Sequence, residues 1–215
     1  MDARFRPPER GIGFKATCLR ASLYIITVGV LMQGVYYEST YLQGSRFSEF
    51  GLTELLQSLL LAISIGLLAL EARRSRPLRQ VATLLLAFLL ASLIREQDSL
   101  LDDTLFDGAW QLLVTLVVVP ALGWTIYQRR RFVAEFGRYA DSFAFGLFAS
   151  GFLCTYVFSR LYGRGSFWEV LTQAHYQYLF KRAAEEITEL FGYQLILFAV
   201  IELTLLARRL TREQP

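Results

Sequence analysis

Six long apolar stretches, separated by short polar segments, dominate the chain. An α-helix rises about 1.5 Å per residue, so about 20 apolar residues are enough to cross the hydrocarbon core of a bilayer. The pattern therefore predicts an all-α fold, an integral membrane bundle of six transmembrane helices. The predicted spans cover residues 20–38, 52–71, 78–96, 109–128, 142–160 and 184–207.

Composition and the clustering of charge support a single membrane domain over residues 1–215. Charged residues make up 19% of the chain, below the roughly one quarter that is typical of soluble domains. Many of them stand in arginine clusters directly after apolar stretches, at 73–76, 129–131 and 208–209. Such clusters mark the ends of spans, so the net charge of +3 reflects membrane topology and predicts no nucleic-acid partner.

The distribution of Lys and Arg predicts the orientation. The polar tail 1–17, the second and fourth loops and the C-terminal segment are rich in arginine, whereas the first and third loops contain only Arg46 and Arg95. Because basic loops stay on the cytoplasmic side, we expect both termini in the cytoplasm and the protein in a bacterial-type inner (plasma) membrane. The fifth loop, residues 161–183, is basic although this topology places it outside.

The segment of about 166–181 has the pattern of an extra amphipathic helix. Ser166 and Glu169 fit a capping box at a helix start. Trp168 and His175 lie two turns apart, among further aromatic residues that prefer the membrane interface. We expect this helix to lie at the outer interface, as a lid over the bundle.

Polar residues recur at one depth in the predicted spans. Counting about 19 residues inward from each basic cytoplasmic edge reaches a polar residue near the outer boundary. Charged side chains inside a membrane pair with one another or mark a functional site. We therefore predict an outward-facing cluster, rich in carboxylates, where several spans meet. Its predicted members are Glu54, Gln57, Arg95, Glu96, Asp98, Arg160, Glu185, Glu186 and Glu189.

Small residues predict close contact between the second and third spans. Ser58, Ala62 and Gly66 follow Glu54 at intervals of four, and a similar stripe precedes Arg95. Such stripes let membrane helices approach closely, within one chain or between copies in an oligomer. In an antiparallel hairpin Glu54 and Arg95 stand level, so we predict an ion pair between them.

Three classes of function fit this pattern. A metal-dependent membrane hydrolase could use His175, Glu185 and Glu189 to hold a divalent cation, the one cofactor that the residues suggest. An ion-coupled transporter could use the charges and the helix break at Pro120, although the spans are nearly free of charge at mid-depth. A non-catalytic scaffold or sensor would need the cluster only for its structure.

One motif suggests a nucleophile. Ala149-Ser150-Gly151 resembles the serine motif of rhomboid-type intramembrane proteases, but Phe148 stands where that family has glycine. No predicted span contains a histidine to act as the base, so the resemblance assigns no family. We interpret the chain as a polytopic membrane protein whose acidic and arginine-containing pocket binds a cation or a lipid headgroup.

Overall fold

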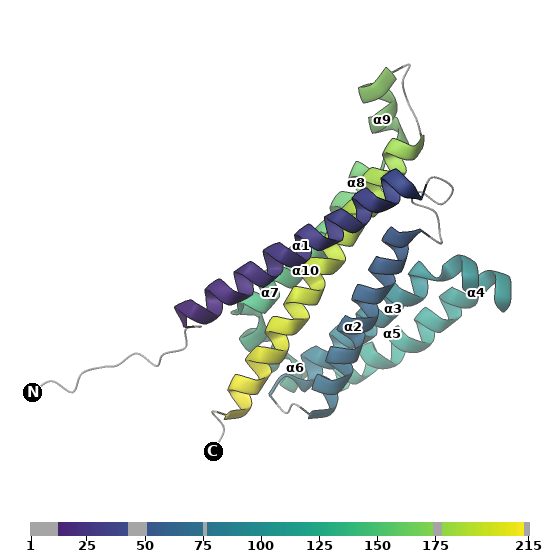
Figure 1. The fold of residues 1–215 in the computed structure, drawn as a ribbon. Helices are drawn as coiled ribbons and strands as arrows, with labels where there is room; N and C mark the ends of the chain where they lie inside the picture. Colours follow the sequence, from purple (N-terminus) through teal and green to yellow (C-terminus); the bar gives the residue numbers. More distant parts are fainter. Residues whose placement is uncertain (1–12, 43–50, 75–76, 174–177, 213–215) are drawn as a thin grey trace, which may run out of the picture.

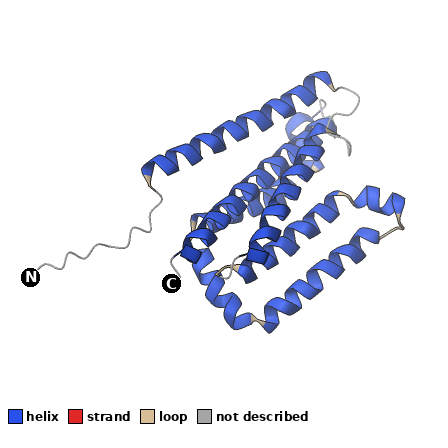
Figure 2. Cartoon of the chain, turned by 60° about the horizontal axis from the view of Figure 1, so that its bottom comes forward, coloured by secondary structure: helices blue, strands red, loops and turns tan. Residues whose placement is uncertain are grey.

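The computed structural model describes residues 13–42, 51–74, 77–173 and 178–212, and every regular element in these ranges is a helix (Figures 1 and 2). The elements are α1 (Phe14–Tyr41), α2 (Leu52–Arg74), α3 (Arg79–Glu96), α4 (Asp98–Thr104), α5 (Ala109–Tyr127), α6 (Arg129–Ala140), α7 (Phe143–Phe152), the π-helix η1 (Leu153–Phe158), α8 (Ser159–Tyr162), α9 (Gly165–Thr172) and α10 (Tyr178–Arg212).

Five helical segments are long and apolar enough to cross a membrane, which indicates an integral, multi-pass membrane protein. They are α1, α2, α5, the continuous segment Phe143–Tyr162 and α10. The predicted span 78–96 is also helical, as α3, but it is only 18 residues long and has Arg79, Arg95 and Glu96 at its ends. The structure thus supports the all-helical membrane fold with five candidate spans, where the sequence predicts six.

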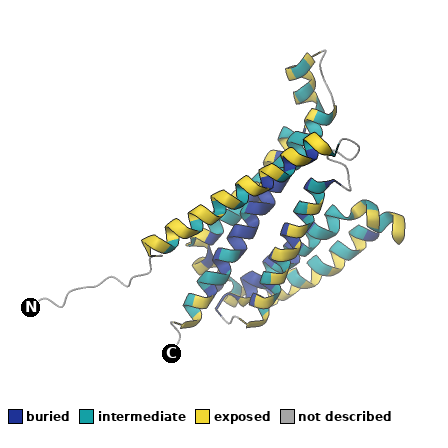
Figure 3. Ribbon diagram, viewed as in Figure 1, coloured by how far each residue is buried: buried dark blue, intermediate teal, exposed yellow. Residues whose placement is uncertain are grey.

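The long helices alternate in direction, so that the start of α1 and the end of α10 lie at one end of the bundle together with α6 (Figure 1). We call this the terminal end, and the end that contains α4, α8 and α9 the opposite end. α10 is the central helix: it packs against α2 on one side and α7 on the other, and its middle is the most buried part of the bundle (Figure 3). α1 is exposed along most of its length.

Two glycines allow the backbones of α7 and α10 to touch. A Cβ atom on Gly151 would lie 2.8 Å from the carbonyl oxygen of Gly192. A Cβ atom on Gly192 would overlap the hydroxyl of Thr155 in η1 and lie 2.9 Å from its backbone nitrogen. Small residues at a helix crossing have this role in membrane proteins, where close van der Waals contact replaces the hydrophobic effect as the driving force for association.

Buried carboxylates from one helix cap the start of another. Glu38 of α1 is fully buried, and its Oε2 accepts hydrogen bonds from the backbone nitrogen (2.8 Å) and the hydroxyl of Thr53 in α2. Glu135 of α6 accepts hydrogen bonds from the backbone nitrogens of Gln80 (2.6 Å) and Val81 (3.4 Å) at the start of α3. The first turn of a helix has unpaired N–H groups and a positive dipole end, so a carboxylate there stabilises both.

The predicted helix at about 166–181 is shorter than expected. α9 ends at Thr172 and α10 begins at Tyr178, while residues 174–177 lie outside the described part of the chain. The capping box at Ser166 is not formed, because α9 already begins at Gly165, and Arg164 precedes it without a side-chain cap. α9 is held on α8 by the indole of Trp168, which donates to the carbonyl oxygen of Tyr162 (2.8 Å).

The Gly192 contact predicts a position-specific effect of alanine. Gly192→Ala forces the backbones of α10 and η1 apart, so we expect it to lower the free energy of unfolding by roughly 1–3 kcal/mol, as overpacking of a tight core does. Gly66→Ala is the matched control, because nothing lies within 4 Å of the added Cβ there. Thermal denaturation of the detergent-purified proteins measures both, and equal midpoints would contradict this description of the crossing.

Candidate functional site

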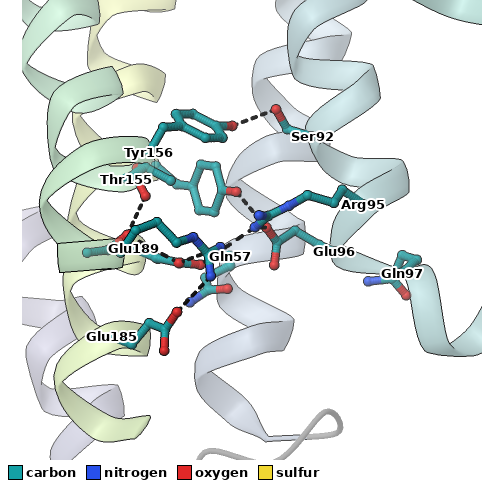
Figure 4. Close-up of polar contacts among 12 residues, drawn as sticks. Gln57, Ser92, Arg95, Glu96, Gln97, Thr155, Tyr156, Glu185 and Glu189 are labelled. Carbon is teal, nitrogen blue, oxygen red and sulfur yellow. Dashed lines mark hydrogen bonds and ion pairs between the residues drawn. The ribbon is translucent and has the colours of Figure 1, made fainter. Parts of the chain in front are cut away.

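A polar cluster lies toward the opposite end of the bundle, where α2, α3, α8 and α10 meet. Figure 4 shows its side chains converging on one another from these separate helices. Its centre is Glu189 of α10, which is only 3% exposed to solvent. A buried carboxylate is stable only when cations and hydrogen-bond donors compensate its charge, so the groups around Glu189 determine what the site can do.

Arg160 of α8 joins two carboxylates of α10. Its Nη1 lies 2.6 Å from Oε1 of Glu185, and its Nη2 lies 2.8 Å from Oε1 of Glu189. Positions i and i+4 share one face of a helix, so one planar guanidinium can reach both carboxylates. The hydroxyl of Ser159 also donates to Oε1 of Glu189, at 3.3 Å.

Arg95 of α3 approaches Glu189 from the other side. Its Nη2 lies 2.6 Å from Oε1 of Glu96 and 4.0 Å from Oε2 of Glu189. The phenol of Tyr193, one turn beyond Glu189, donates to the same oxygen of Glu96 at 2.7 Å. These ion pairs of Arg95 replace the predicted pair with Glu54, because the side chain of Arg95 is directed toward α10 and not along the α2–α3 contact.

Gln57 connects α2 to the cluster. Its Nε2 donates to the backbone oxygen and to Oε2 of Glu186, at 3.0 Å each. The residue is 1% exposed, so this amide is one of the most buried polar groups of the bundle. Near the same end, Nε2 of Gln97 donates to the hydroxyl of Ser58 at 3.0 Å and links α2 to the end of α3.

A cavity of about 720 Å³ opens beside this cluster. Its charged walls are formed by Glu54, Arg95, Glu96, Asp98, Arg160, Arg182, Glu186 and Glu189, and its apolar walls by Leu55, Ala62, Leu93 and Leu100. The structure therefore places most of the predicted site residues around one cavity, with Gln57 and Glu185 hydrogen-bonded to residues of its wall. Carboxylates outnumber arginines on the walls, and two of these arginines are already engaged in ion pairs.

Among the residues of this site that sequence reasoning missed are Tyr193 and Arg182. Both have a recognisable spacing, because Arg182 precedes Glu186 by four residues and Tyr193 follows Glu189 by four. The i, i+4 rule therefore places them on the same faces of α10 as those carboxylates. The cluster was predicted by counting residues from the basic end of each span, which gives depth but not the face of the helix. For this reason the predicted set did not include Arg182 and Tyr193.

The predicted metal site finds no support in the geometry. His175 lies outside the described residues, and among those described no group of three or more His, Cys, Asp or Glu side chains could hold a metal ion. Glu185 and Glu189 instead have the guanidinium of Arg160 between them. This cation compensates their charge, and a divalent ion bound by the same two carboxylates would have to displace it.

No family model matches the chain, and no match was found among curated proteins or solved structures. Function must therefore be inferred from the cavity itself.

Removal of the Arg160 side-chain charge tests the electrostatic description of the cluster. Arg160→Gln leaves Glu189 buried with Arg95 as its remaining cation. Because Arg160 is 42% exposed, solvent screening keeps the expected loss of stability at roughly 1–2 kcal/mol, below that of a fully buried pair. The exposed Arg164→Gln is the control, and we expect it to change the unfolding midpoint little.

The double variant Arg160→Gln/Glu189→Gln makes this test more specific. It removes the Glu189 carboxylate together with its closest cation, so it should be more stable than Arg160→Gln alone. If the two substitutions instead add independently, Arg160 does not act through Glu189.

Proposed function

We propose that the cavity binds the headgroup of an amine-bearing lipid at the outer boundary of the membrane. The observation that carries this proposal is the mixed lining of the cavity: charged groups of both signs share its walls with Leu55, Leu93 and Leu100. A volume of about 720 Å³ suits a small molecule or a headgroup. An amphiphile with a charged head and an apolar tail matches such a lining.

The charges on the walls favour an ammonium group with a neighbouring phosphate. The excess of carboxylates attracts a cation, and Glu186 is oriented by the amide of Gln57. No ion pair involves Arg182 within the described part of the chain, so its guanidinium is available for a phosphate oxygen. A zwitterionic phospholipid headgroup combines both groups, whereas a metal ion would use the carboxylates alone.

The proposal requires the cavity to face outward, and this follows if α3 crosses the membrane as a sixth span. A helix of 18 residues is about 27 Å long, close to the hydrocarbon thickness, and the charged residues of α3 stand at its two ends. α3 packs between α2 and α5, which are both candidate spans. With six crossings the arginine-rich terminal end is cytoplasmic by the positive-inside rule, and the cavity is on the outer side.

Lipid binding can be measured by native mass spectrometry of the purified protein with added phosphatidylethanolamine. The variant Asp98→Asn/Glu186→Gln removes two carboxylates of the walls and should reduce occupancy by this lipid by roughly tenfold or more. Asp103→Asn, at an exposed position of α4 outside the cavity, is the control and should bind as the unmodified protein does. Equal binding by all three proteins would exclude the cavity as an amine-binding site.

Cysteine labelling tests the topology separately. In a background with Cys18 and Cys154 replaced by serine, Asp103→Cys in α4 should react with a membrane-impermeant maleimide on intact cells. Arg138→Cys in α6 should react only after the membrane is permeabilised. Labelling of Arg138→Cys on intact cells would show that the terminal end faces outward.

A further inference from the structure

A second pocket, of about 320 Å³, lies between α2 and α10 at the terminal end of the bundle, far along both helices from the polar cavity. Its walls are formed by Leu67, Leu70, Glu71, Arg74, Thr204, Arg208, Thr211 and Arg212. The pocket thus lies between the C-terminal turns of α2 and α10, which are both candidate membrane spans.

The charge of this pocket is opposite to that of the polar cavity. Its walls contain three arginines, Arg74, Arg208 and Arg212, and one carboxylate, Glu71. The arginines are exposed, whereas Glu71 is 7% exposed. Within the described residues none of the three arginines takes part in a salt bridge, so their guanidinium groups are available to a ligand.

Apolar residues lie on the deeper side of the pocket. α2 runs toward the terminal end, so Leu67 and Leu70 precede Arg74 by one to two turns and lie closer to the middle of the bundle. The hydroxyls of Thr204 and Thr211 donate to backbone oxygens of their own helix, so they offer only acceptor lone pairs to the pocket. The donors that face a ligand are therefore the guanidinium groups.

We propose that this pocket binds a phosphate group, supplied either by the headgroup of an anionic lipid or by free phosphate. Guanidinium groups bind phosphate oxygens in a bidentate, charge-assisted manner, and arginines from two helices can hold one phosphate between them. Basic pockets between membrane helices on the cytoplasmic side are suited to anionic headgroups. The leucines lie at the depth where the apolar part of a lipid would begin.

The test compares two triple variants of the full chain in detergent. Arg74→Gln/Arg208→Gln/Arg212→Gln removes the guanidinium groups of the pocket. Arg129→Gln/Arg130→Gln/Arg138→Gln removes three exposed arginines of α6 at the same end, outside the pocket, and changes the net charge equally. Binding of phosphatidylglycerol is measured by native mass spectrometry, with phosphatidylcholine as the neutral lipid, and inorganic phosphate is added in a separate thermal-shift series.

We expect the unmodified protein and the α6 variant to retain phosphatidylglycerol over phosphatidylcholine, and the pocket variant to lose at least roughly tenfold in affinity. A thermal shift with inorganic phosphate that is lost in the pocket variant would assign free phosphate as the ligand. An equal loss of lipid affinity in both triple variants would overturn the proposal, because the lipid would then be attracted by the overall positive charge of this end and not by the pocket. The absence of any loss of affinity in the pocket variant would also overturn it. If the pocket variant does not fold, Arg74→Lys/Arg208→Lys/Arg212→Lys keeps the charge without the bidentate fork and should bind phosphate more weakly than the unmodified protein.

Discussion

The close contact between the backbones of α7, η1 and α10 at Gly151 and Gly192 determines where the charged groups can meet. Gly192 lies one turn from Glu189, and Thr155, which Gly192 faces, lies one turn from Ser159. Because the two segments touch at this level, the next turn brings Arg160 within 2.8 Å of Glu189. Larger side chains at the glycines would separate the helices and leave the carboxylates of α10 without this cation.

The π-helical turn of η1 contributes to the same arrangement. A π-turn adds about one residue to the helix and rotates everything that follows by roughly 100°. η1 ends at Phe158, directly before Ser159 and Arg160, so this rotation helps to determine which face of α8 is turned toward α10. The wider turn is also anchored, because the thiol of Cys154 donates to the backbone oxygen of Thr188 at 3.4 Å.

The apolar pattern was enough to predict most of the fold, because a membrane span needs a fixed length of apolar sequence. The predicted spans at 52–71 and 109–128 begin at the first residues of α2 and α5. Most of the polar residues that were predicted to lie at one depth also line one cavity. Depth alone does not specify rotation about a helix axis, and for this reason the partner of Arg95 was predicted as Glu54 and found to be Glu96 and Glu189.

Other features depend on contacts that no local pattern records. The arginines at 129–131 were interpreted as a loop after a span, yet they begin α6, whose Glu135 reaches back to cap α3. Glu38 is the last residue of the predicted span 20–38, but its role as the cap of α2 depends on how α1 and α2 pack. In both cases a carboxylate is buried because another helix begins beside it, which is a relation between distant segments and not between neighbours in sequence.

The two ends of α10 carry charges of opposite sign. Toward the opposite end it contributes Glu185, Glu186 and Glu189 to a cavity rich in carboxylates, and at the terminal end Arg208 and Arg212 to a basic pocket. Between them, Glu202 is 5% exposed and accepts hydrogen bonds from Arg20 (2.8 Å) and from the phenol of Tyr24 (2.8 Å), both in α1. The ring of Tyr24 also stacks on Phe198, with centroids 4.0 Å apart. α1 is exposed along most of its length. Its Arg20 and Tyr24 join it to the central helix by compensating the charge of Glu202, which would be costly to bury alone.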